Sequence, residues 1–209
     1  MTEQKIALLF PGQGTQYIGM GRDVYDRFPA AKEVYHKAKD ILGFTTWARC
    51  FYKLLQRASF RRTDYTQIAV FVTNHAFYEL LMKTLPSLKY HATAGHSLGE
   101  YNAIVASGAI SFENAIPLIQ KRGEYMHSVS IKVDGGLRAL TGRSDVDIDS
   151  KLMELEKKGV YVALANTPKQ IIIGGKNKEL EAVVEELKQS GIRLRKVEVE
   201  GPFHTPYMK

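Results

Sequence analysis

The chain has 209 residues, 44% hydrophobic and 24% charged, a composition that fits a globular protein and excludes a disordered or fibrous one. Its formal charge of +7 is dispersed along the chain, which favours anionic partners such as phosphorylated cofactors or acidic proteins over nucleic acid. A single cysteine, Cys50, excludes an internal disulfide, and the start of the chain and its short apolar runs predict a cytoplasmic protein with no membrane partner.

The first part of the chain predicts a strand, a glycine-rich loop and several helices. Residues 5–10 form a short apolar run stopped by Pro11 and Gly12, which predicts a buried strand. The loop at 11–16 is rich in glycine and side-chain amides, so its backbone N–H groups could cradle an anion, although it lacks the pattern of a dinucleotide-binding loop or a P-loop. Helical spacing then predicts helices at 30–42, 47–60 and 66–85. On the last of these, His75 is interpreted as a core or boundary histidine and not as a ligand, and no clustering of histidine or cysteine indicates a metal site.

Residues 92–101, Ala-Thr-Ala-Gly-His-Ser-Leu-Gly-Glu-Tyr, are the most distinctive stretch. Small residues end in Gly-X-Ser-X-Gly and lead into an apolar, helix-compatible segment, which is the pattern of a nucleophile elbow. Gly95 and Gly99 suit this turn because strand and helix come too close there for a β-carbon. The turn would expose the Ser97 hydroxyl and direct the backbone N–H of Leu98 at a developing oxyanion. A plain tight turn is the alternative for so short a motif.

The second part of the chain predicts another helix and then a change of rhythm. Residues 112–127 predict a helix that carries Arg122, and residues 132–136 predict the exit from a first domain. Strand and helix signals then follow the order β-α-β-β-α-β, typical of a ferredoxin-like subdomain. These elements are expected at 137–141, 146–157, 160–165, 170–174, 178–189 and 194–199. A serine nucleophile needs a base, and the candidate is His204, in a Gly-Pro-bounded loop after the last strand; a structural loop histidine is the alternative.

Five blocks of sequence occur in the order found in malonyl-CoA:acyl carrier protein transacylases, so the chain resembles this family, which includes the acyltransferase domains of fatty acid and polyketide synthases. The blocks are Phe-Pro-Gly-Gln-Gly-Thr-Gln (10–16), Gly-His-Ser-Leu-Gly-Glu-Tyr (95–101), Lys-Arg-Gly-Glu-Tyr-Met (121–126), Asn-Thr-Pro-Lys-Gln-Ile-Ile-Ile-Gly (166–174) and Gly-Pro-Phe-His-Thr (201–205). The resemblance implies an α/β fold, with an α/β-hydrolase-like large domain at 1–132 plus 200–209. A ferredoxin-like small subdomain would be inserted at 133–199.

The resemblance also implies the roles of five residues. Ser97 would be the nucleophile and His204 its general base and acid, while the backbone N–H groups of Gln13 and Leu98 would form the oxyanion hole. Arg122 would pair with the free carboxylate of a malonyl group, a role that suits a planar guanidinium. The implied enzyme is an S-malonyltransferase of fatty acid or polyketide biosynthesis. It would move malonyl from malonyl-CoA, as substrate, to the phosphopantetheine thiol of an acyl carrier protein through an acyl-serine, with no bound cofactor and no metal.

Two alternatives stay open: an acyl hydrolase of the same fold, and a truncated, catalytically incompetent fragment. The second rests on the family's continuation well beyond its histidine block, whereas this sequence ends five residues after His204. The family's later segment supplies a backbone carbonyl that orients the histidine, so we expect this chain alone to be a poor catalyst. The segment at 136–142 also departs from the family, whose strand here is usually more apolar, with methionine at the position of Leu137 or Arg138.

Overall fold

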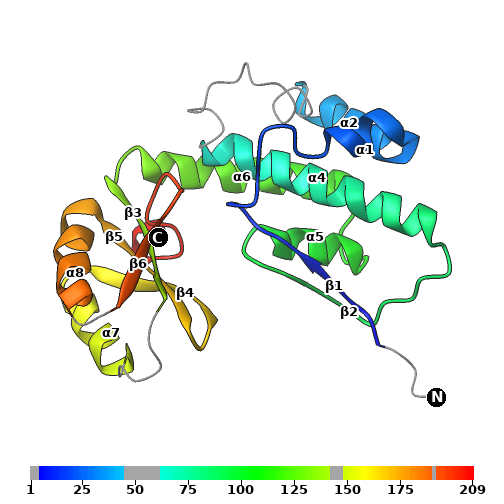
Figure 1. Cartoon of the computed structure of the whole chain (residues 1–209). Coiled ribbons are helices and arrows are strands. Elements are labelled where there is room, and N and C mark those ends of the chain that lie inside the picture. The colour runs from blue at the N-terminus through cyan, green and yellow to red at the C-terminus, as the bar shows by residue number, and fades with distance from the viewer. Residues whose placement is uncertain (1–4, 45–61, 142–147, 190–191) are drawn as a thin grey trace. The chain divides into compact units, whose positions relative to one another are not determined.

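The computed structural model describes residues 5–44, 62–141, 148–189 and 192–209. The helix predicted at 47–60 lies outside these residues. The chain divides into two compact units, Met1–Glu124 and Tyr125–Lys209, whose elements are labelled in Figure 1. The sequence instead predicts a large domain at 1–132 plus 200–209 and a small subdomain at 133–199, and these bounds stay a prediction. None of the helices in the described ranges is long and apolar enough to cross a membrane.

The first unit combines a small parallel sheet with helices. Strand β1 (Ala7–Phe10) pairs in parallel with β2 (Ala92–Gly95), and Phe10 lies opposite Gly95. Because parallel strands point the same way, both end at one edge of the sheet, where the loops that follow them meet. The helices are α1 (Arg22–Arg27), α2 (Pro29–Leu42), α4 (Thr63–Thr84), α5 (Gly99–Ala106) and the first part of α6 (Phe112–Ser130).

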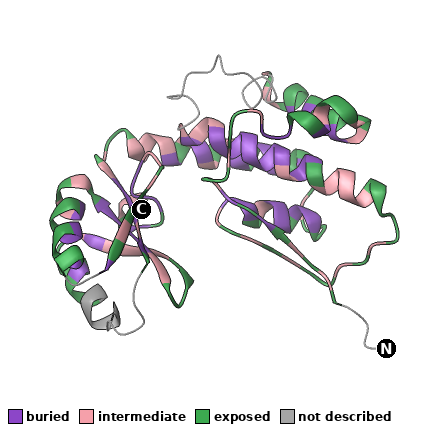
Figure 2. Ribbon diagram, viewed as in Figure 1, coloured by how far each residue is buried: buried purple, intermediate pink, exposed green. Residues whose placement is uncertain are grey.

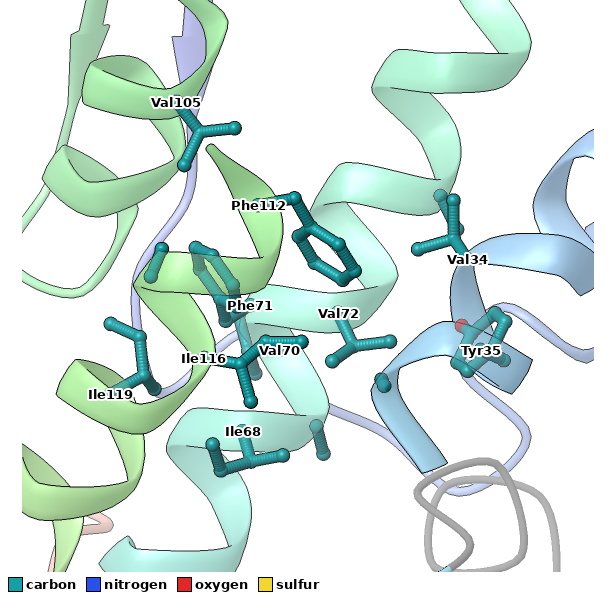
Figure 3. Packing of buried hydrophobic residues seen from close by; sticks show 14 of the residues in the cluster. Val34, Tyr35, Ile68, Val70, Phe71, Val72, Val105, Phe112, Ile116 and Ile119 are labelled. Carbon is teal, nitrogen blue, oxygen red and sulfur yellow. The ribbon is translucent and has the colours of Figure 1, made fainter. Parts of the chain in front are cut away.

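The core of this unit forms around α4. The helix is buried on nearly all sides over its first four turns, as Figure 2 shows, because apolar residues occupy every face of it and not one stripe. Phe71 of α4 stacks on Phe112 of α6 with 5.6 Å between ring centroids, and Tyr35 of α2 is fully buried on another side of the helix. Figure 3 shows these side chains interleaving with those of Ile68, Val72 and Ile116.

The expected burial of β1 is wrong for half of its residues. Phe10 is buried and Leu8 packs with it against α5, but Leu9 is 75% exposed. Successive side chains of a strand point to opposite faces of a sheet, and the helix packs on the face of Phe10. A continuous apolar run therefore does not reveal which of its members reach the core.

The second unit has the predicted ferredoxin-like order, which confirms the α/β fold class. Its elements are β3 (Gly135–Thr141), α7 (Ile148–Lys157), β4 (Val160–Thr167), β5 (Gln170–Lys176), α8 (Asn177–Gln189), β6 (Arg193–Val197) and the 3-10 turn Pro206–Met208. The antiparallel sheet has the order β4-β5-β3-β6. Leu140 on one face packs with the helices, while Leu137 on the other packs with Phe203, so the two faces of β3 serve separate cores.

Candidate active site

The serine motif forms the sharp strand–turn–helix junction that its spacing predicts. Strand β2 ends at Gly95, helix α5 begins at Gly99, and Ser97 between them has φ 53°, in the left-handed region that is strained for a residue with a β-carbon. A β-carbon on Gly95 would collide with the carbonyl of Gly99, and one on Gly99 with the carbonyl oxygen of Phe10. Only glycine fits at both positions, so the backbone path that presents Ser97 is set by sterics.

The glycine-rich loop after β1 lies against this turn. The backbone N–H of His96 donates to the carbonyl of Phe10 at 3.1 Å, and Gly12 is so close to the carbonyl of His96 that a β-carbon would collide with it. Gln13 is the next residue of the loop, and Leu98 follows Ser97 at the start of α5. The loop and the elbow thus belong to one contiguous region, while the oxyanion role of the Gln13 and Leu98 N–H groups stays a prediction.

Helix α6 brings the guanidinium of Arg122 to the serine. Its Nη2 donates to Ser97 Oγ at 3.1 Å, its Nη1 donates to Gln67 Oε1, and its Cζ lies 5.7 Å from the centre of the Tyr101 ring. The neighbouring Gly123 allows this approach, because a β-carbon there would be 2.8 Å from the backbone of α4. Burial lowers the pKa of the Arg122 guanidinium from its ordinary value, although an arginine remains cationic at neutral pH. A cation therefore lies in hydrogen-bonding contact with the candidate nucleophile.

Sequence reasoning missed the residues that hold this arginine. Gln67 and Thr63 of α4 are fully buried; Gln67 Nε2 donates to Thr63 Oγ1 at 2.9 Å, and Thr63 Oγ1 donates to Gln13 Oε1 at 2.8 Å. One signal was available in the sequence: two polar residues four positions apart on one face of a mostly apolar helix. The predicted helix began at 66 and so left Thr63 outside it.

His204 belongs to the second unit. It is exposed, with φ 59°, between the buried residues Phe203 and Thr205, and the Thr205 hydroxyl donates to the carbonyl of Pro202. Non-glycine residues rarely adopt this backbone conformation, which singles out His204 as it does Ser97. Ser97 belongs to the first unit and His204 to the second, so their partnership stays a prediction.

Comparison with known proteins gives consistent matches over nearly the whole chain. The profile of the acyl transferase domain family matches residues 7–209. A curated relative, the malonyl CoA-acyl carrier protein transacylase of Bacillus subtilis (strain 168), is 37% identical over 208 residues, which are 98% of this chain and 64% of the relative. The chain therefore spans less than two thirds of that relative's length.

Solved structures agree with this match. The malonyl CoA-acyl carrier protein transacylase of Clostridium perfringens superposes with a TM-score of 0.86 at 35% identity, over 98% of this chain and 64% of that one. A malonyl-transacylase in complex with a type II polyketide-synthase acyl-carrier protein superposes with a TM-score of 0.88 at 29% identity, over 98% of this chain and 66% of that one.

Proposed function

Because the chain belongs to the acyl transferase domain family, we propose that it is a serine acyltransferase that moves a malonyl group from coenzyme A to the phosphopantetheine thiol of an acyl carrier protein. The observation that carries this proposal is the Arg122 guanidinium at 3.1 Å from Ser97 Oγ. In a malonyl thioester only one methylene separates the carbonyl carbon that is attacked from the free carboxylate. A cation beside the nucleophile therefore lies where that carboxylate arrives.

The proposed reaction has two halves that use the same groups. Ser97 Oγ attacks the thioester carbonyl carbon, its proton passes to His204, and the N–H groups of Gln13 and Leu98 stabilise the tetrahedral oxyanion. The intermediate collapses, the carbon–sulfur bond breaks, and coenzyme A leaves as the thiol after taking the proton from His204. The phosphopantetheine thiol then attacks the acyl-serine with loss of its proton to His204. Ser97 regains a proton as the acyl group departs.

Arg122 supplies the selectivity for a dicarboxylic donor. The guanidinium can pair with the free carboxylate of a malonyl group. An acetyl or longer acyl group has no such carboxylate, so the buried charge would stay unpaired, which is costly. Arg122→Ala should therefore lower malonyl transfer strongly, by an amount of order 2–5 kcal/mol for a desolvated pair. Acetyl transfer should fall much less, and equal losses for the two donors would show that Arg122 does not read the carboxylate.

The proposed partner and substrate also fit the charge of the chain. A formal charge of +7 favours the phosphates of coenzyme A and an acidic carrier protein. Relatives are named for polyketide biosynthesis as well as for the transacylase alone, so the proposed pathway is that of fatty acids or polyketides.

The direct test is an intact mass of the protein after incubation with malonyl-CoA. We expect one malonyl adduct, absent in Ser97→Ala and present in the control Ser107→Ala, whose hydroxyl donates to the Ile104 carbonyl at the end of α5. The adduct should disappear on addition of a holo acyl carrier protein, with malonyl found on the carrier. Loss of the adduct to water at the same rate without an acceptor would indicate a hydrolase. No adduct on the wild-type chain would indicate a catalytically incompetent one and contradict the proposal.

A further inference from the structure

A chain of hydrogen bonds runs from the candidate nucleophile into the buried face of α4. Arg122 donates with one amino group to Ser97 Oγ at 3.1 Å and with the other to Gln67 Oε1. Gln67 then donates to Thr63 Oγ1 at 2.9 Å, and Thr63 donates to Gln13 Oε1 at 2.8 Å. This hydrogen-bond network joins α6, α4, the elbow and the loop after β1, which are the four segments that meet at this site.

Because arginine can only donate, it sets the direction of the hydrogen bonds that Arg122 and Gln67 make in this network. An arginine can only donate, so the oxygen of the Gln67 amide has to face Arg122. The amide nitrogen then faces Thr63 and donates to its hydroxyl oxygen, and the Thr63 hydroxyl donates in turn to Gln13 Oε1. Each group donates to the next from Arg122 onward, and bonds aligned in this way polarise and strengthen one another.

The position of Gln67 is one that an apolar residue would ordinarily occupy. The side chain is fully buried and its neighbours on α4, Ile68 and Phe71, belong to the hydrophobic core. A buried amide without partners would be destabilising, whereas here both of its ends are paired. Glutamine also differs from glutamate in one respect that matters for the site: it accepts from the guanidinium without neutralising its charge.

We propose that Gln67 is the positioning residue that sets the preference for a malonyl donor. By accepting from Nη1 it fixes one edge of the Arg122 guanidinium, so that Nη2 faces Ser97 Oγ and the place where the donor's carboxylate arrives. Because Gln67 is neutral, the positive charge remains available to that carboxylate. This inference rests on the proposed malonyl transfer, in which Gln67 touches neither substrate nor the reacting atoms.

Two variants test the orientation and the charge separately. Gln67→Met keeps a long unbranched side chain but removes the acceptor, and should lower kcat/KM for malonyl-CoA about tenfold or more, equivalent to about 1.4 kcal/mol. Gln67→Glu keeps the shape of the side chain but pairs the guanidinium with an internal carboxylate, and should lower kcat/KM for malonyl-CoA further. A glutamate also accepts where the amide donated, so Thr63 has to turn its proton away from Gln13.

The readout is the ratio of kcat/KM for malonyl-CoA to that for acetyl-CoA, with a holo acyl carrier protein as acceptor. This ratio does not depend on the fraction of each variant that is folded, because both donors meet the same active molecules. A matched control is Thr73→Val, which removes another buried hydrogen bond of α4, the one between the Thr73 and Tyr35 hydroxyls at 2.8 Å, outside the network. It should change stability and leave the ratio as in the wild type.

We expect the ratio to fall in both Gln67 variants while acetyl transfer changes by less than about threefold. An unchanged ratio in both variants, with malonyl transfer by the wild type, would overturn the role of Gln67 and leave the proposed function intact. A wild-type chain that forms no malonyl adduct would overturn the proposed function itself. A fall in the ratio for Thr73→Val as large as for Gln67→Met would show that any loss of core packing disturbs selectivity, and would also overturn the inference.

Discussion

His75 should make the first unit sensitive to acid. Its side chain is 8% exposed, and its ring stacks on that of Phe112 with 4.0 Å between centroids. Burial lowers the pKa of His75 from 6.5 to about 4; the Glu113 carboxylate opposes this shift and the Lys37 ammonium adds to it. Glu79 also faces the ring, with 3.6 Å between its Oε1 and Nε2. This environment agrees with the interpretation of His75 as a core residue.

The magnitude follows from the two pKa values. Between pH 6.5 and about 4 the unfolded chain binds a proton at His75 that the folded chain does not. The contribution of neutral His75 to the free energy of unfolding is therefore complete above pH 6.5 and is lost progressively as the pH falls toward 4. A shift of this size corresponds to about 3 kcal/mol in the free energy of unfolding. His75→Phe keeps an aromatic ring against Phe112 and removes the titrating group. Between pH 6.5 and 4 the free energy of unfolding of this variant should therefore fall by about 3 kcal/mol less than that of the wild type.

The assay is urea unfolding at constant ionic strength across this pH range, followed for the wild type, His75→Phe and His36→Phe. His36 is exposed on α2, and its replacement leaves His75 in place. The free energies of unfolding of wild type and His75→Phe should diverge below pH 6.5, whereas His36→Phe, which keeps His75, should still show the loss of stability that His75 causes in this window. An NMR titration of the His75 ring protons should show a midpoint near 4. Parallel curves for His75→Phe, or a midpoint near 6.5, would refute the reasoning.

Two further predictions concern the backbone of the elbow and a buried charge. Gly99→Ala places a methyl group against the carbonyl of Phe10 and should destabilise the first unit by about 3 kcal/mol or more. Gly108→Ala, at φ 80° with open space around the added carbon, should cost only about 1 kcal/mol, and similar thermal midpoints for the two variants would contradict the steric argument. In the second unit Arg138 is 7% exposed and pairs with Glu181, whose side chain is 62% exposed. Glu181→Ala should lower the thermal midpoint more than Arg138→Met, because only the first leaves a buried charge without its carboxylate; the opposite order would contradict this.

Patterns that act over a few residues predicted much of this protein. The order β-α-β-β-α-β followed from alternating strand and helix signals, because hydrophobic periodicity is a local property of each element. The elbow followed from Gly-X-Ser-X-Gly, since the collisions that exclude a β-carbon at Gly95 involve the backbone only four residues away. Candidate residues such as Ser97 and Arg122 were named from the motifs and from the family that they resemble.

The surroundings of those residues depend on chain segments that the sequence keeps far apart. Gln67 and Arg122 are 55 positions apart, and only the packing of α4 against α6 brings the amide to the guanidinium. The same holds for Thr63, whose hydroxyl reaches Gln13 across 50 positions, and for Leu9, which is exposed because the helix packs on the opposite face of β1. Local propensity carries no information about which face or which partner a residue meets. That choice belongs to the tertiary structure, because burial and hydrogen bonding are settled between elements and not within them.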